Sequence, residues 1–542
     1  MNILKLLSAS LLLMIIPGKS ETTDNVPLYS VIEIGFEGKR YVVTDNPVRD
    51  IVLQTTWINE DSRKTLTVYG FYDGDGSGNP SGNIFRVRFC PTETGKWTLI
   101  RVVSNDRKLN GQHEGLQINA TASEHHGFWM PDPESPGSRW YKRSDGTHQY
   151  ITGNTMYSFL SEYFRDKPAG GNIRDDIIKN SIYFKKVRIG ITGDRYPHPS
   201  SKPFLDFTGN PTDDGNYSHR PNTEWFYNRL DRAVKTGFEK DLITDLILNG
   251  PDTKESRSVL KAAGNNNDVT PILRYIAARY GSYQNVWLCL SNEFDIKEPS
   301  FTPSQIISFG EILQTFLPYP TPVSVHSVRF WTKALNTPSP SWFDHVILQS
   351  KLKKSDQSAD HIEINFIIGG ENKPVIDDEL AYEGKGDGWT EEDVVEAFLG
   401  AFAGGGYGST GHKPANKEGH YFSGNFKPEE HRSADNLLWF REVIDNDIRF
   451  WKMEPVPVVS SDNIFMEKFD SRLRILGLKG EEYVLAGSFQ ARVTAILPEG
   501  SWMISSYDLI SMQKKVLSEK AEGRFEIDFS SSRAQMFHLK KI

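Results

Sequence analysis

Three stretches of different periodicity predict a multidomain protein in which a (β/α)8 TIM barrel lies between two antiparallel β-sandwiches. Short alternating strands separated by turn residues fill residues 21–125, and the same pattern returns over 456–542. Between them, over 135–455, apolar strands alternate with helices. Apolar–polar alternation is typical of half-buried strands, whereas strand–helix repetition is typical of a parallel sheet. A chain of 542 residues can build several such cores.

Residues 1–20 have the pattern of a secretory signal peptide. Lys5 precedes the apolar run 11–16, and the small residues Gly18 and Ser20 suit cleavage. The sequence after residue 20 contains no run of about 18 apolar residues, so it predicts no membrane-spanning helix. We therefore expect an exported protein, either periplasmic or secreted.

The N-terminal segment, residues 21–125, is expected to form an immunoglobulin- or fibronectin-like sandwich. Strand-like stretches such as "YSVIEIGFEG" and "IFRVRFCPTETGKWTLIRVVS" are separated by Gly, Asp, Asn and Pro clusters, as in "DGDGSGNPSGN". Spacing of this kind is typical of small antiparallel sandwiches. The C-terminal segment, residues 456–542, repeats it in "EYVLAGSF" and "GRFEIDFS" and is expected to form a second sandwich.

The middle segment contains enough strand–helix pairs for a closed barrel. Helical patterns occupy residues 174–184, 222–237, 269–281, 304–316 and 391–404. Eight strands that alternate with helices over about 300 residues have the number and the length expected of a (β/α)8 barrel. The strand candidates are residues 150–157, 186–193, 241–248, 285–293, 322–327, 345–350, 374–379 and 404–411.

Composition and motifs exclude several classes of function. The formal net charge is −8 without basic blocks, which disfavours nucleic acid and anionic membranes as partners. Cys90 and Cys289 follow apolar strands in different segments, and we expect two buried free thiols. There is no HExxH motif, no Gly-x-Ser-x-Gly elbow, and "GGGYGSTG" lacks the lysine of a phosphate-binding loop. No metal or cofactor is expected.

Two carboxylates stand where barrel strands are predicted to end. In "NVWLCLSNEFD", residues 285–295, Asn292 and Glu293 follow the fourth strand candidate, and Glu379 ends the seventh. Barrel enzymes keep their chemistry at this end of the strands. Glycoside hydrolysis needs two carboxyl groups, one to protonate the departing oxygen and one to attack or to activate water. Asn292 is placed to hydrogen-bond the hydroxyl next to the reacting carbon.

These motifs carry a family resemblance that covers nearly the whole mature chain. "GFYDGDG", "RVRFCPTETGKWT", "GNTMYSFL", "NVWLCLSNEFD", "KPVIDDELAYEG" and "GGGYGSTGH" resemble a bacterial family with a β-sandwich, an apiosidase-like barrel and a small β-domain. The Asn-Glu pair and the later Glu resemble the retaining glycoside hydrolases of clan A. The resemblance implies a glycoside hydrolase with Glu293 as acid/base and Glu379 as nucleophile. We expect it to act on a plant or algal polysaccharide or a derived oligosaccharide.

The sequence leaves alternatives for the substrate pocket, the nucleophile and the class of function. The stretch "GDRYPHPSSKPFLDFTGNPTDDGNYSHR" departs from the family pattern, and "DDELAYEG" offers Glu383 beside Glu379. Glu379 is preferred because it directly ends the strand candidate. A different class of function is a non-catalytic carbohydrate-binding protein with a degenerate barrel. Polar residues at or beyond strand ends form the predicted substrate-binding set: Asn292, Tyr157, Arg188, His198, His326, Gln349, Tyr382, Glu383 and His412. Arg188 has a second interpretation, a cation inside the barrel that keeps the nucleophile ionised.

Overall fold

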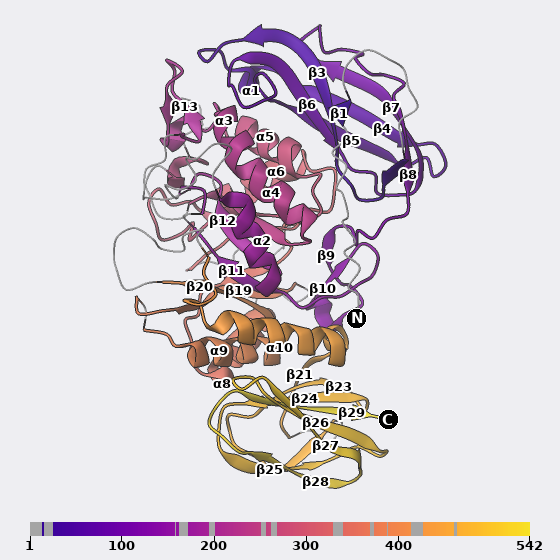
Figure 1. Ribbon diagram of the computed structural model, residues 1–542, viewed down its shortest axis with the longest axis vertical. Helices are drawn as coiled ribbons and strands as arrows, with labels where there is room; N and C mark the ends of the chain where they lie inside the picture. Colours follow the sequence, from indigo (N-terminus) through magenta and orange to yellow (C-terminus); the bar gives the residue numbers. More distant parts are fainter. Residues whose placement is uncertain are drawn as a thin grey trace, which may run out of the picture.

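A computed structural model describes the protein in three parts stacked along its long axis (Figure 1). An N-terminal β-domain caps one side of a barrel, and a C-terminal β-domain covers the other. The predicted fold class is therefore confirmed. The described residues are 14–15, 25–157, 159–161, 172–193, 201–250, 256–261, 268–328, 340–368, 373–386, 388–413, 426–459 and 463–542.

The predicted signal peptide, residues 1–20, lies outside the described residues except for β1 (Met14–Ile15), which pairs in parallel with β3. Within the described ranges, no helix has the length and apolarity that a membrane crossing requires. Cys90 and Cys289 are buried free thiols, as expected from the sequence.

The N-terminal domain is a sandwich whose two layers share one strand. Residues 65–69 of β5 pair with β4, and residues 70–72 pair with β6, so this strand passes from one layer to the other. Inward-facing aromatic residues such as Trp57 and Trp97 fill the space between the layers. The elements are β2 (Asn25–Pro27), β3 (Ile32–Tyr41), α1 (Pro47–Asp50), β4 (Leu53–Asn59), β5 (Thr65–Tyr72), β6 (Gly82–Phe89), β7 (Gly95–Ser104) and β8 (Gln117–Thr121). A hairpin of β9 (Trp129–Pro131) and β10 (Tyr141–Arg143) leads to the barrel.

Eight parallel strands form the barrel, in the order β17-β16-β15-β12-β11-β20-β19-β18. The two outer strands of this order meet at a single parallel bridge between His326 and Ile347, which closes the barrel. Each strand candidate from the sequence corresponds to one of these strands. They are β11 (Thr152–Thr155), β12 (Lys186–Gly190), β15 (Ile243–Asn249), β16 (Val286–Ser291), β17 (Val323–Ser324), β18 (Val346–Leu348), β19 (Val375–Glu383) and β20 (Tyr407–His412).

Helices follow the strands and cover the outside of the barrel (Figure 1). The five predicted helical stretches are all helical, and two further helices, α8 and α10, were not predicted. On α8, buried Ala359 and Ile362 alternate with exposed Ile364 and Ile367, so its sequence lacks a clear apolar face. The helices are α2 (Ile173–Tyr183), α3 (Thr223–Trp225), α4 (Asp231–Glu239), α5 (Thr270–Tyr280), α6 (Pro303–Gln314), α8 (Ser355–Ile368), α9 (Glu391–Ala403) and α10 (Ser433–Asp447), with one π-helical turn, η5 (Phe226–Leu230), between α3 and α4.

Smaller elements lie in the connections of the barrel. They are η1 (Pro136–Ser138), β13 (Phe204–Leu205), β14 (Pro211–Thr212), η4 (Gly215–Tyr217), η6 (Ser256–Ser258) and η7 (Phe450–Lys452). The β13–β14 hairpin belongs to the connection after β12 and reaches the N-terminal domain, where Arg220 Nη2 donates to the carbonyl oxygen of Val43 at 2.8 Å.

A buried ion network joins the N-terminal domain to helices α4 and α5. Arg88 of β6 donates to Glu33 of β3 at 2.9 Å and to Asp231 of α4 at 2.6 Å. Arg279 of α5 donates to both carboxylate oxygens of Asp231 at 2.8 Å, and to Asp73 at 2.8 Å. Burial would raise the pKa of Glu33, but Arg88, Lys235 and Arg86 lower it to about 2. We call Glu33, Asp73, Arg88, Asp231 and Arg279 the interdomain network.

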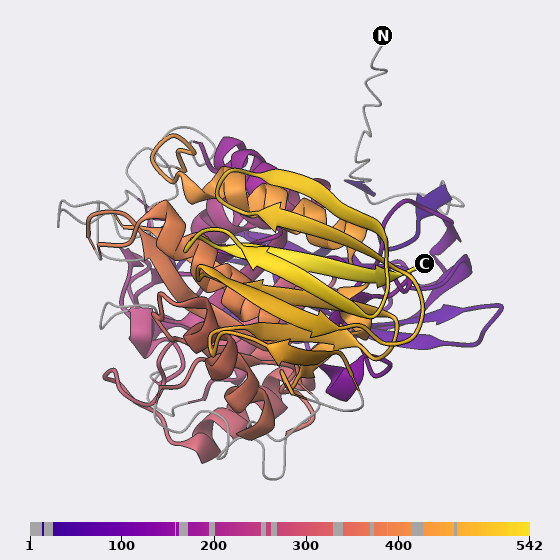
Figure 2. The same ribbon diagram turned by 90° about the horizontal axis from the view of Figure 1, so that it is seen from below.

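The C-terminal domain is a second sandwich that lies across helices of the barrel (Figure 2). Its sheets have the orders β21-β23-β24-β29-β26-β27 and β22-β25-β28. Asn436 of α10 donates to the carbonyl oxygens of Leu509 and Ile510, which fixes the domain against the barrel. The strands are β21 (Glu454–Val456), β22 (Phe465–Lys468), β23 (Arg474–Leu478), β24 (Glu482–Gly487), β25 (Ala491–Ile496), β26 (Trp502–Asp508), β27 (Gln513–Ala521), β28 (Arg524–Phe529) and β29 (Gln535–Lys541).

Candidate active site

Glu293 occupies a strained turn directly after β16. The strand ends at Ser291, and Glu293 has a φ of 45°, in the left-handed region that residues other than glycine rarely adopt. Its side chain is almost buried and forms an ion pair with Lys297. Backbone strain of this kind persists only where the surroundings enforce it, and it clusters at functional sites.

Arg257 is what enforces this turn. Its guanidinium group is buried after β15 and donates to the carbonyl oxygens of Asn292 at 2.8 Å and Glu293 at 3.2 Å. Two charge-assisted hydrogen bonds to successive carbonyls fix the path of the chain at the strand end. Arg257 was not predicted as a site residue, because nothing in its local sequence distinguishes it from a surface arginine.

Glu379 lies inside β19, not at its end, which corrects the sequence-based reason for choosing it. The strand continues to Glu383, and its register with β20 shifts between Asp377 and Ala381. Residues 378–380 therefore form a bulge, because Asp377 pairs with Gly408 and Ala381 with Thr410. Bulges are frequent next to active sites, where they redirect a side chain.

The carboxylate of Glu379 meets three polar side chains from other strands. Tyr157 donates its hydroxyl proton to Glu379 Oε1 and accepts a hydrogen bond from Arg188 Nη1 at 2.8 Å. Arg188 Nη1 itself lies 4.0 Å from Glu379 Oε1, and His326 Nδ1 lies 3.6 Å from it. Burial and the nearby Glu379 raise the pKa of Tyr157. Its hydroxyl group therefore stays protonated and acts as the hydrogen-bond donor. These contacts hold the carboxylate in one position.

Asn292 is held in one orientation by two donors. Its Oδ1 accepts from Arg188 Nη2 at 2.8 Å and lies 2.7 Å from His326 Nδ1. Arginine can only donate, so the amide oxygen must face it, and Nδ1 of His326 must carry a proton. Burial and Arg188 lower the pKa of His326 to about 3, which leaves this imidazole neutral. Arg188 thus connects Asn292 on one side with Tyr157 and Glu379 on the other.

A layer of buried charges lies in the barrel beneath Arg188. Lys186 forms ion pairs with Asp378 and, at 3.3 Å, with Asp245. Burial would raise the pKa of Asp378, but Lys186 and Arg188 lower it below its usual range. Burial raises the pKa of Asp245. Lys186 and Asp245 were not predicted. In the sequence, inward-facing polar residues of a barrel strand look like the usual alternation of polar and apolar residues.

Glu383 and His412 form a separate group at the ends of β19 and β20. The Glu383 carboxylate accepts from the backbone N–H groups of Arg432 at 2.8 Å and Ser433 at 2.9 Å, at the start of α10. The imidazole of His412 stacks on that of His431, with ring centroids 5.8 Å apart. Among the described residues, neither Glu383 nor His412 forms a hydrogen bond or ion pair with Glu379. Glu383 stabilises a helix N-terminus.

The remaining predicted residues have mixed placements. Tyr382 is buried beside Tyr157 in a small cluster at the site. Gln349 is half-buried directly after β18. His198 lies outside the described residues. In the part of the chain that the structure describes, no cluster of three or more His, Cys, Asp or Glu side chains could hold a metal ion.

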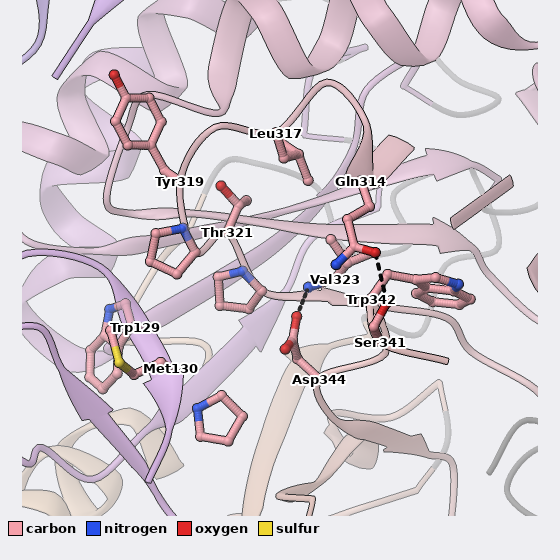
Figure 3. Close-up of a pocket in the computed structure, with 13 residues that line it drawn as sticks. Trp129, Met130, Gln314, Leu317, Tyr319, Thr321, Val323, Ser341, Trp342 and Asp344 are labelled. Carbon is pink, nitrogen blue, oxygen red and sulfur yellow. Dashed lines mark hydrogen bonds between the residues drawn. The ribbon is translucent and has the colours of Figure 1, made fainter. Parts of the chain in front are cut away.

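A cavity of about 140 Å³ lies at the opposite end of the barrel (Figure 3). It is lined by Trp129, Tyr319, Trp342 and Asp344, which precede β17 and β18 or come from the β9 strand. The amino ends of barrel strands carry stability rather than chemistry. This cavity is therefore not the active-site candidate.

Two family models match the chain. Residues 25–101 match a domain of unknown function, DUF5060, and residues 195–421 match an apiosidase-like catalytic domain, a range that includes both Glu293 and Glu379. The second match covers most of the barrel, which is therefore similar to an apiosidase-like catalytic domain. No curated protein matches this chain.

Solved structures of glycoside hydrolases are similar to this chain in fold. A candidate glycoside hydrolase from Bacteroides vulgatus ATCC 8482 has 20% sequence identity and a TM-score of 0.73 over 96% of this chain and 100% of its own. A glycoside hydrolase of family 5 from the same organism has 14% identity and a TM-score of 0.58, over 77% of this chain and 94% of its own. The chain thus has a fold used by glycoside hydrolases.

Proposed function

We propose that the protein is a retaining glycoside hydrolase in which Glu379 is the nucleophile and Glu293 the acid/base. One observation carries the proposal: Arg188 connects Asn292, which precedes Glu293 after β16, with Tyr157, which follows β11 and donates a hydrogen bond to Glu379 of β19. Retaining hydrolysis needs an ionised carboxylate and a second carboxyl group on either side of the scissile bond. In this arrangement, Glu379 is the proposed first group and Glu293 the proposed second group.

In the proposed reaction, Glu293 protonates the departing oxygen while Glu379 attacks the anomeric carbon and forms a glycosyl-enzyme ester. Glu293 then takes a proton from water, which attacks the same carbon. This attack cleaves the ester and releases the sugar and the Glu379 carboxylate. Tyr157 and Arg188 hold the Glu379 carboxylate in place for the attack. The ion pair between Glu293 and Lys297 has to open, and Glu293 has to take up a proton, before Glu293 can act as the acid.

The proposed substrate is a plant or algal polysaccharide or an oligosaccharide derived from one. The match to an apiosidase-like catalytic domain supports a glycan substrate. The pattern of residues 1–20 supports export to the periplasm or the medium, where such polymers are found.

Two variants test the assignment of roles with aryl glycosides of a sugar that the wild type hydrolyses. Glu379→Ala should lower kcat by about 10⁴-fold or more, and azide should restore turnover with a product of inverted configuration. Glu293→Ala should spare substrates with activated leaving groups, which need no proton, and azide should then give a product of retained configuration. The reverse pattern would exchange the two roles.

The alternative is a carbohydrate-binding protein with a catalytically inactive barrel. A panel of plant and algal glycans separates the two functions when hydrolysis and binding are both measured. Tight binding without any release of reducing sugar would refute the hydrolase proposal. The polar contacts that hold the Glu379 carboxylate in place favour the hydrolase, because binding alone requires no carboxylate fixed in this way.

A further inference from the structure

The bulge in β19 turns two successive acidic side chains toward the barrel interior. Asp378 contacts Lys186 and Ser409 there, and Glu379 contacts Tyr157 and Arg188. In a regular strand, successive side chains point to opposite faces. Leu380 restores the alternation, because its side chain and that of Phe398 on the outer helix α9 both lie against Gly408 of β20. Without the bulge, Asp378 and Glu379 could not both face inward.

A bulge breaks the ladder of backbone hydrogen bonds, and here two threonines replace the lost partners. Thr155 of β11 donates its hydroxyl to the carbonyl oxygen of Asp378 at 3.0 Å. Thr410 of β20 donates to the carbonyl oxygen of Ala381 at 2.7 Å. The two hydroxyl groups bind the chain on either side of Glu379. Buried carbonyl groups are normally paired, so these bonds stabilise the shifted register.

The carboxylate of Asp378 adds a third attachment. It forms an ion pair with Lys186 of β12 and accepts from Ser409 of β20 at 2.6 Å. Asp378, Lys186 and Ser409 are all fully buried. Three strands, β11, β12 and β20, therefore hold the single residue that precedes Glu379.

We propose that Thr155 and Asp378 are positioning residues for the hydrolysis: they fix the bulge in β19 and so hold the Glu379 carboxylate toward the anomeric carbon. The inference rests on the proposed function. Both side chains are fully buried, and each acts through the backbone next to Glu379. Because a displacement of about 1 Å at a reacting group can cost about 100-fold in rate, a small relaxation of the bulge is enough to be measured.

Thr155→Val tests the proposal, and Thr152→Val is its matched control. Both threonines are fully buried on β11, but Thr152 Oγ1 has no hydrogen-bond partner among the described residues. Valine has nearly the same shape as threonine, so each variant removes one hydroxyl group. Thr155→Val should lower kcat about 10- to 100-fold with KM changed less than about 2-fold. Thr152→Val should leave both constants within about 2-fold of wild type.

Asp378→Asn is the second variant, and it keeps the side-chain shape while removing the charge that pairs with Lys186. It should lower kcat with an unchanged KM, and its melting temperature shows whether it is folded. If it does not fold, the comparison of Thr155→Val with Thr152→Val decides alone.

The outcomes separate the two proposals. Equal kcat values for Thr155→Val and Thr152→Val, in a wild-type protein that hydrolyses glycosides, would overturn the positioning role and leave the proposed function intact. A parallel loss of melting temperature and kcat in both variants would also overturn it. A wild type that hydrolyses no glycan, or a Glu379→Gln variant with full activity, would overturn the proposed function and the positioning role together.

Discussion

Replacing Arg88 by Met should allow the N-terminal domain to unfold independently of the barrel. Arg88 is fully buried on β6, and its guanidinium group makes four hydrogen bonds across or beside the interface. They reach Glu33 in its own domain, both carboxylate oxygens of Asp231 on α4, and the carbonyl oxygen of Arg279 on α5. Methionine keeps most of the aliphatic stem and removes only the charged end.

The magnitude follows from what the variant leaves behind. Asp231 keeps Arg279, and Glu33 keeps Arg86 at 2.8 Å, so neither carboxylate becomes fully unpaired. The Arg279 carbonyl oxygen loses the donor at 2.6 Å, a loss that costs about 1–3 kcal/mol in a buried site. Removing one partner of a buried ion pair costs about 3–5 kcal/mol when the other charge is left uncompensated, so this cost is an upper limit here. We therefore expect a total between about 1 and 5 kcal/mol.

Calorimetry and urea unfolding measure this loss, with Arg86→Met as the control. Arg86 is on the same strand and pairs with Glu33 and Asp73, both within the N-terminal domain. Arg88→Met should split one unfolding transition into two, with the N-terminal domain unfolding first, whereas Arg86→Met should not split it. The buried network should also resist screening, so 1 M NaCl should leave the difference nearly unchanged. Equal behaviour of the two variants would refute a special role of Arg88 at the interface.

Two further predictions concern carboxyl groups outside the proposed catalytic pair. Glu383→Gln should lower the free energy of unfolding by about 1 kcal/mol, because it weakens the contact with the N-terminus of α10, and keep kcat within about 2-fold; a loss of activity like that of Glu379→Ala would make Glu383 the nucleophile. Asp344→Asn should gain stability over wild type as pH rises. Burial raises the pKa of Asp344 to about 7, so the folded wild type keeps a proton that the unfolded chain releases above about pH 3.9, and its stability falls between those values. Asn lacks this dependence, so its advantage in urea unfolding should be larger at pH 8 than at pH 5 by at most about 3 kcal/mol; an advantage independent of pH would contradict the raised pKa.

The sequence predicted the barrel because its strands are buried on both faces. The runs at Val286–Ser291 and Ile243–Asn249 are fully buried, and their apolar residues stand out from the flanking turns. Helix α8 was missed since isoleucines lie on its exposed face as well as its buried one. The strand pattern could therefore be recognised from local composition, and this helix could not.

At the candidate site, the sequence selected Glu293, Glu379 and Arg188, but not the contacts that fix the backbone at the two glutamates. Glu293 follows a buried strand, which local sequence shows directly. The bulge that orients Glu379 depends on Thr155 and Thr410 from other strands, and the turn at Glu293 depends on Arg257 from the preceding connection. Contacts between segments far apart in sequence are set by the barrel closure, which no local pattern encodes.

The fixed orientation of Asn292 gives the candidate site a direction. Hydrogen bonds run outward from the permanently charged Arg188 and the neutral imidazole of His326 into the amide oxygen, so the amide group can offer only its N–H bonds to a ligand. Each bond in such a chain polarises the next one, which makes those N–H groups stronger donors than a free amide. A ligand group that meets Asn292 must therefore present a lone pair, and its own proton must point to another acceptor. An ammonium group at that position would meet a donor and be rejected, whereas a hydroxyl oxygen would be accepted.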